Sequence, residues 1–229
     1  MTIHQIQNQC RAAIASIASQ IAPGIALREI RDLCEKYLLS NGAESFWYWN
    51  VGAFVFSGKD TVLSLSGRDY QTADRTIGEN DIITIDLSPQ CQSVWGDYAR
   101  TLIVEHGRVV PAIDAIETTE WRRGLLAQGQ LHRFMQDFVS PDTTFEELFF
   151  AANRQIERMG YRNLDFCGNL GHSIVRDKKD RIYIEKGNTA KLSAVEAFTF
   201  EPHICAENGS FGYKQEDIYC FAQGRLTTL

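Results

Sequence analysis

The chain has 229 residues, with 23 Lys plus Arg against 29 Asp plus Glu, which gives a formal net charge of −6 with neutral histidines. Its 44% hydrophobic and 23% charged residues are typical of globular proteins and exclude a disordered or fibrous chain. The acidic balance and the lack of a basic stripe argue against nucleic acid as a partner, because such binding depends on Lys and Arg contacts to phosphates. The apolar runs are too short to span a bilayer and the N-terminus does not resemble a secretory signal. We therefore expect no membrane association and a cytoplasmic location.

Helices and strands are expected to alternate in two blocks along the chain. Apolar residues at helical spacing predict a pair of helices at the start and another pair in the middle, and β-branched and aromatic runs predict antiparallel strands after each pair. No Pro-, Gly- or Ser-rich linker separates the blocks, so we predict a single α+β domain over residues 1–229 with internal pseudo-symmetry. The predicted helices cover 3–20, 26–40, 111–138 and 143–159, and the predicted strands lie between 46 and 105 and at 181–185, 195–202 and 211–221.

Two aspartates stand out because they accompany hydrophobic strands. Asp86 ends the strand that contains IDLSP, and Asp97 follows in WGDYART. A tight reversal near Pro89-Gln90 would place the two carboxylates side by side, where they need a shared proton, a neighbouring cation or a metal ion. Arg100 is a weak candidate for that cation, because three residues along a strand it faces the other way. Taken alone, the pair favours a hairpin cap and a salt bridge over a metal site.

Three later residues shift this balance toward a metal site. His172 lies in the glycine-flanked segment GNLGHSI, where the backbone can approach another strand closely. Glu201 interrupts the aromatic strand AFTFEP, and Glu216 lies just before a hydrophobic strand in KQEDIYCF. Both carboxylates are expected to be buried and so to need compensation. Four carboxylates with one imidazole favour paired Mn, Co, Zn or Fe ions over a structural zinc site.

The motifs IDLSP, GDYARTL, GNLGH, FTFEP and QED, in that order, resemble those of the pita-bread metallohydrolases, which include methionine aminopeptidase, aminopeptidase P, prolidase and creatinase. The resemblance covers roughly residues 50–221. It implies a pita-bread fold with two pseudo-symmetric halves of antiparallel strands covered by helices. It also implies two divalent metal ions, held by Asp86, Asp97, His172, Glu201 and Glu216.

The resemblance further implies a role for each of these residues. Asp97 and Glu216 would bridge the two ions, Asp86 would chelate one of them, and His172 with Glu201 would complete the other. A hydroxide between the metals would cleave an amide bond, with Glu201 as a catalytic residue that relays the proton. Arg100 and Thr101, directly behind the second aspartate, would orient the ligands.

The sequence departs from the family's peptidases at two substrate-facing histidines. Residues 55–70 contain no histidine, and the stretch after His172 offers only Lys178, Lys179 and Arg181 where a second is expected. Loss of one such hydrogen-bond donor typically slows a reaction by ~10²–10³. His203, two residues beyond Glu201, would face the same cavity on a continuous strand and serve as a catalytic residue. Alternatively, Pro202 breaks the strand and His203 is a rim residue.

Three further residues are candidates for substrate binding. Trp47 and Trp49 belong to an aromatic segment that either lines an apolar pocket or packs as a lid over the core. Lys179 either holds a substrate carboxylate or belongs to a solvated turn.

The predicted function is hydrolysis of an amide bond in a small-molecule or short-peptide substrate. The missing histidines keep two alternatives open, a specialised small-molecule hydrolase or lyase of the same fold and a catalytically inactive binding protein. The second is disfavoured because all five ligand positions are retained. A homodimer is compatible with the resemblance.

Overall fold

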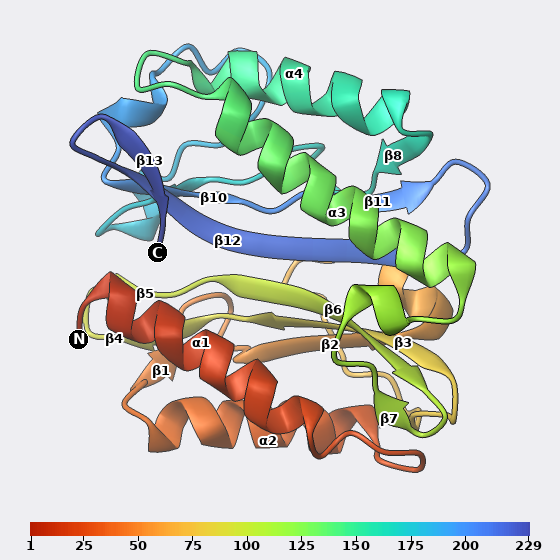
Figure 1. The fold of residues 1–229 in the computed structure, drawn as a ribbon. Helices are drawn as coiled ribbons and strands as arrows, with labels where there is room; N and C mark the ends of the chain where they lie inside the picture. Colours follow the sequence, from red (N-terminus) through yellow and green to blue (C-terminus); the bar gives the residue numbers. More distant parts are fainter.

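The computed structural model describes all 229 residues, as two pairs of helices on either side of a layer of strands (Figure 1). Helices α1 and α2 cover the strands of the first half, and α3 and α4 cover those of the second. The helices are α1 (Ile3–Ala18), α2 (Leu27–Ser40), α3 (Thr119–Phe138) and α4 (Phe145–Arg158). The strands are β1 (Ser45–Phe46), β2 (Ala53–Ser57), β3 (Asp81–Leu87), β4 (Pro89–Cys91), β5 (Val94–Trp95), β6 (Tyr98–Glu105), β7 (Arg108–Val109), β8 (Tyr161–Asn163), β9 (Ser173–Ile174), β10 (Ala197–Phe200), β11 (His203–Ala206), β12 (Gly212–Ala222) and β13 (Arg225–Thr228).

Capping residues and an apolar face explain where the helices form. Thr2 and Thr144 start α1 and α4 with reciprocal capping boxes, in which Gln5 and Glu147 return a bond to the cap. Each helix buries one apolar face: α1 and α2 pack on β2, β3 and β6, while α3 and α4 pack on β10 and β12. The two hydrophobic cores lie on opposite faces of β3 and β6, because Ile83 and Val104 belong to the core under α1 and α2, whereas Ile82 and Ile103 belong to the core under α3 and α4.

The main sheet has ten strands, with the order β2-β3-β6-β12-β10-β9 along its central path. The two halves meet where β6 pairs with β12, with Glu216 opposite Ala99 and Gln215 opposite Arg100. In the first half, Asp86 on β3 is also opposite Ala99 on β6. The junction between the halves therefore lies directly beside two of the predicted ligand positions.

The observed elements match the predicted α+β order, with four local differences. The third helix begins at Thr119 because a short 3₁₀ turn occupies Ile113–Ala115. Residues 181–185 form only an isolated bridge between Tyr183 and His172, not a strand, and the terminal strand β13 was not predicted. The chain reverses after β4, at Gln92 with a φ of 55°, rather than at Pro89-Gln90.

None of the helices has the length and the apolar character that crossing a membrane requires.

Candidate metal centre

Strand register brings the two predicted aspartates to the same side of the sheet. Asp86 lies near the end of β3, and Asp97 directly precedes β6, which pairs with β3 in antiparallel fashion. The backbone of Asp97 is held by Gln7 of α1, whose side-chain amide donates to the Asp97 carbonyl and accepts from the Asp97 N–H. Only 5% of Asp97 is exposed, so the first helix fixes a buried carboxylate.

The glycine before His172 permits the close backbone approach that positions the imidazole. Gly171 has a φ of 142°, and a Cβ added there would lie 2.3 Å from the carbonyl oxygen of Thr199. The His172 N–H donates to Thr199 Oγ1 at 2.9 Å, and the Thr199 N–H donates to the His172 carbonyl at 2.8 Å. This segment is thereby fixed against β10, which leads into Glu201.

The hydrogen bonds of His172 select the tautomer that suits a metal ligand. Its Nδ1 lies 3.2 Å from the carbonyl oxygen of Ser173, which can only accept, so in the neutral ring Nδ1 carries the proton. Nε2 is then left with a lone pair, 3.3 Å from Asp97 Oδ2 and 3.6 Å from Glu201 Oε1. A lone pair facing two carboxylates requires a proton or a metal cation between them.

Glu216 gives the most direct indication of a cation site. The side chain is fully buried on β12, and neither carboxylate oxygen has a hydrogen-bond partner. Asp97, His172 and Glu216 each offer a ligand atom within 4.8 Å of the other two, which is close enough to hold one ion. Two carboxylates and an imidazole are hard and intermediate ligands that suit a divalent metal. These three residues, called the triad below, fit a divalent ion.

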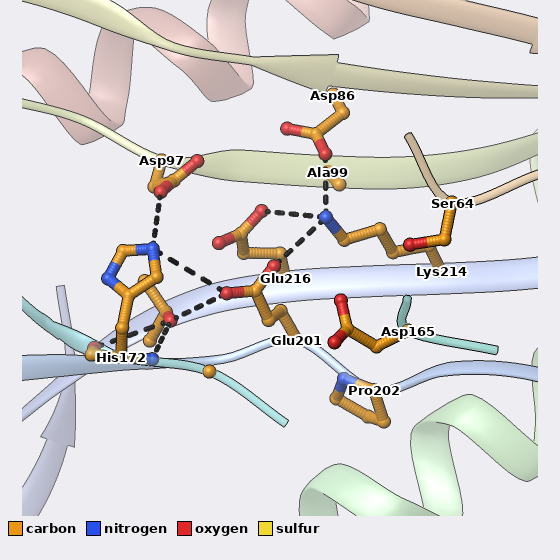
Figure 2. A network of polar contacts seen from close by, with 12 residues as sticks. Ser64, Asp86, Asp97, Ala99, Asp165, His172, Glu201, Pro202, Lys214 and Glu216 are labelled. Carbon is orange, nitrogen blue, oxygen red and sulfur yellow. Dashed lines mark hydrogen bonds and ion pairs between the residues drawn. The ribbon is translucent and has the colours of Figure 1, made fainter. Parts of the chain in front are cut away.

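Lys214 lies among the remaining carboxylates, as Figure 2 shows. Its Nζ is 2.6 Å from Asp86 Oδ2, 3.0 Å from Glu201 Oε2 and 3.6 Å from Glu216 Oε2. This lysine is not among the site residues predicted from the sequence. A signal was available, because residues two apart on a strand face the same side and Lys214 precedes Glu216 by two on β12.

Burial and the Lys214 ammonium shift the pKa values of these carboxylates in opposite directions. Burial raises the pKa of Asp97 to about 7 and raises the pKa of Glu216 well above its usual range. Burial also acts on Glu201, but the Lys214 ammonium and His172 outweigh it and lower the pKa of that carboxyl. Glu201 is therefore held ionised, and its Oε1 also accepts a bond from Thr199 Oγ1 at 3.1 Å.

Arg100 and Thr101, the two residues predicted to orient the ligands, contact the backbone of β12 rather than the ligand carboxylates. Arg100 donates to the Glu216 carbonyl at 2.7 Å and forms an ion pair of the same length with Asp217. Thr101 Oγ1 accepts from the N–H of Lys214 at 2.9 Å. Both residues hold β12 in register at the junction between the halves.

A cavity of about 360 Å³ opens beside these residues. Its wall includes Asp86, Asp97, His172, Glu201 and Lys214, and aromatic and aliphatic side chains line another part of it. The apolar wall comprises Trp47, Tyr48, Phe54, Phe56, Leu63, Leu65, Phe166 and Tyr183. Leu65, near the position of the first missing histidine, thus supplies an apolar surface. The volume suits a small ligand.

His203 reaches the cavity wall even though Pro202 interrupts the strand. It begins β11 rather than continuing β10, and its Nε2 lies 2.7 Å from the carbonyl oxygen of Thr61. Nε2 must donate to that carbonyl, so Nδ1 is the ring atom that can accept a proton. Burial lowers the pKa of His203 to about 4, which keeps the ring neutral.

Of the three predicted substrate-binding residues, only Trp47 lines the cavity. Its ring lies edge-on to His172 at 5.7 Å. Trp49 is 52% exposed and lies outside the cavity, beneath the guanidinium of Arg68. Lys179 forms an exposed ion pair with Asp177, because a 3₁₀ turn directs it to solvent. This placement corrects the prediction for Trp49 and Lys179.

Arg181 is the residue from the Lys178–Arg181 stretch that reaches the cavity. Its guanidinium lies 4.8 Å from the ring centroid of Trp47. Asp165, also on the wall, was not predicted either, and burial raises the pKa of its carboxyl. Neither residue belongs to a motif, so only the folded chain brings them to the site.

Comparisons with known proteins agree with the fold. Methionine aminopeptidase from Helicobacter pylori is 24% identical over 206 residues, which cover 86% of this chain and 76% of that protein. The structure of X-Pro aminopeptidase from Thermotoga maritima matches 99% of this chain with a TM-score of 0.80 at 20% identity, and that of prolidase from Pyrococcus furiosus matches 99% with a TM-score of 0.74 at 22% identity. The chain spans 59% and 62% of those two structures, respectively.

The match to a protein family extends over nearly the whole chain. Residues 2–221 match the model of metallopeptidase family M24, a range that includes the triad, Asp86, Glu201 and Lys214. The fold is the pita-bread fold of that family. The chain belongs to metallopeptidase family M24.

Proposed function

We propose that this protein is a metal-dependent hydrolase that cleaves an amide bond in a small substrate. The observation that carries the proposal is the triad of Asp97, His172 and Glu216, which is buried beside a cavity of small-molecule size. The methionine aminopeptidase, X-Pro aminopeptidase and prolidase relatives support hydrolysis of an amide bond. A divalent ion bound at the triad would polarise a carbonyl group and lower the pKa of a water molecule.

Residues of this chain supply the remaining parts of such a reaction. Glu201 is ionised and lies next to the triad, so one of its oxygens can accept a proton and return it to a leaving amine. His203 presents Nδ1 as a neutral proton acceptor on the same wall. Trp47 and its apolar neighbours exclude water from the substrate side.

A second candidate function is a reaction on a specialised small substrate rather than on an ordinary peptide, and the lining of the cavity favours it. In each of its two imidazoles Nε2 is already engaged, by the carboxylates in His172 and by the Thr61 carbonyl in His203, so neither Nε2 is free to donate to a peptide substrate. Arg181 instead offers a guanidinium beside Trp47, where it could hold a substrate carboxylate. These contacts support a non-peptidase hydrolase or lyase of the same fold.

Metal analysis of the purified protein tests the proposal first. We expect at least one equivalent of divalent ion per chain, and Asp97→Ala should lose it because the triad then keeps only two ligands. Asp142→Ala is a matched control, since Asp142 forms an exposed ion pair with Lys191 and should retain the wild-type metal content. A wild-type protein without divalent metal after reconstitution would refute the hydrolase proposal.

A substrate panel then separates the two candidates. Dipeptides, Xaa-Pro peptides and small carboxylate-bearing amides should be assayed with added Mn²⁺, Co²⁺ or Zn²⁺. Turnover of peptides supports the aminopeptidase-like activity, whereas turnover restricted to the small amides supports the specialised enzyme.

A further inference from the structure

The ammonium group of Lys214 occupies the position where a second cation of a dinuclear centre would have to bind. Its Nζ contacts Asp86 at 2.6 Å and Glu201 at 3.0 Å, and Glu216 lies at 3.6 Å. Asp86 is the ligand that the family resemblance assigns to one ion only. With that carboxylate in an ion pair, a second ion would lack its own ligand.

We propose that this protein binds one divalent ion, at the triad, and that Lys214 replaces the second ion as a built-in cation. The inference rests on the proposed function only in taking the triad as a divalent-ion site. It concerns how many ions the chain binds, which the family membership leaves open.

The charges at the site agree with a single ion. Asp86, Asp97, Glu201 and Glu216 carry four negative charges when ionised, and one divalent ion with Lys214 supplies three positive charges. Two divalent ions beside the lysine would supply five and would place an ammonium group against a second divalent ion. Like charges at such distances in a buried site repel strongly.

The backbone of Lys214 is fixed, and its side chain is largely buried. Its side chain is 15% exposed, and its backbone N–H and carbonyl both contact Thr101 Oγ1, at 2.9 Å and 3.2 Å. Lys214 and Glu216 face the same side of β12 (Figure 2). The strand that presents a triad ligand therefore presents the lysine to the same site.

Metal stoichiometry tests this inference directly. The protein, stripped with a chelator and reloaded with excess Mn²⁺, should contain one equivalent after removal of free metal. Lys214→Met removes the charge, keeps a side chain of similar length and frees Asp86, so the metal content should double to two equivalents. Lys191→Met is the matched control, because Lys191 forms a 2.7 Å ion pair with Asp142 on the surface, and it should stay at one equivalent.

Electron paramagnetic resonance adds a readout that does not depend on activity. Mn²⁺ in the wild type should give the hyperfine pattern of an isolated ion, and in Lys214→Met the signal of two spin-coupled ions. If Lys214→Met does not fold, anomalous diffraction from Mn²⁺-loaded wild-type crystals still decides the question. Density at the triad with Lys214 on Asp86 supports the inference, and density for an ion on Asp86 overturns it.

The possible results separate this inference from the proposed function. Two equivalents in the wild type, or one equivalent in a folded Lys214→Met, would overturn the role of Lys214 and leave the hydrolase proposal intact. No bound metal in the wild type would overturn both.

Discussion

His203 connects the cavity wall to the segment that carries Glu201. Its Nε2 donates to the carbonyl of Thr61, and Thr61 Oγ1 accepts the N–H of Gly212 at the start of β12. The imidazole therefore serves two purposes in one position, since one ring nitrogen fixes the wall and the other remains available to accept a proton.

Replacement of His203 should separate these two contributions. His203→Ala should lower kcat by about 10², the usual contribution of a proton-transferring side chain, with metal content unchanged. It should also lower the free energy of unfolding by about 1–3 kcal/mol, because the buried Thr61 carbonyl loses its donor. Steady-state kinetics, metal analysis and urea unfolding measure the three effects.

His203→Gln provides the control for the structural effect. The glutamine amide can still donate to Thr61 but cannot act as a base, so stability should recover while kcat stays low. Wild-type kcat in His203→Gln would limit His203 to bracing the wall.

Several residues of the site could be predicted because each violates an expectation for its surroundings. Glu201 places a charge within an aromatic strand, and Asp86 ends a hydrophobic one, so both indicate a compensating cation. Lys214 and Arg181 violate no such expectation, because a lysine or arginine near a strand end normally faces solvent. The two-residue spacing places Lys214 on the same side of its strand as Glu216, but its approach to Asp86 depends on the pairing of β12 with β6. The position of Arg181 depends on the turn before Tyr183, which no local pattern specifies.

Among the elements, the contact between β10 and residues 171–172 determines where the imidazole of His172 lies. Gly171 lies against the Thr199 backbone, and the N–H and the carbonyl of His172 both bond to Thr199. Because β10 leads directly into Glu201, a displacement of this segment changes the distance between His172 and Glu201.

Gly171→Ala should therefore weaken metal binding through packing. The added Cβ would meet the Thr199 carbonyl and push His172 away from the triad, so we expect at least about a tenfold loss of metal affinity, on the scale of defects in ligand orientation. Isothermal titration with Mn²⁺ or Zn²⁺ measures the effect.

Gly168→Ala is the matched control for backbone strain. Gly168 also has a positive φ, of 78°, but no atom lies within 4 Å of an added Cβ. Its substitution should cost about 1 kcal/mol of stability and leave metal affinity near the wild-type value. Equal losses of affinity in both variants would show that strain, and not crowding, affects the site.

Predicted and observed elements agree best where a helical spacing of apolar residues is accompanied by a capping motif at the end of the helix. The helix α4 combines a capping box at Thr144 with an apolar face, and its predicted start lies within two residues of the observed one. By contrast, residues 181–185 have the composition of a strand but form only an isolated bridge at Tyr183, with backbone hydrogen bonds that join Ile182 and Ile184 to residues 170–173. Strand formation depends on a neighbouring edge, which the local sequence does not contain.

At the scale of the whole molecule, the triad joins the two halves of the fold. Asp97 comes from the first half, whereas His172 and Glu216 come from the second. Between β6 and β12 the register pairs only Arg100 with Gln215 and Ala99 with Glu216, supported by the ion pair of Arg100 with Asp217. An ion bound to all three ligands would add a link across this short junction.

Metal binding should therefore raise the stability of the whole molecule. A ligand that binds only the folded state at a free concentration of 100 Kd stabilises it by about 2.7 kcal/mol. We expect a gain of this size in urea unfolding of the metal-loaded protein relative to the chelated protein, with a single transition because the halves unfold together. In Asp97→Ala the same metal addition should give little or no gain, because the first half then contributes no ligand to the triad. An equal gain in Asp97→Ala would show that the ion binds elsewhere, and a gain confined to the second of two transitions would show that it does not link the halves.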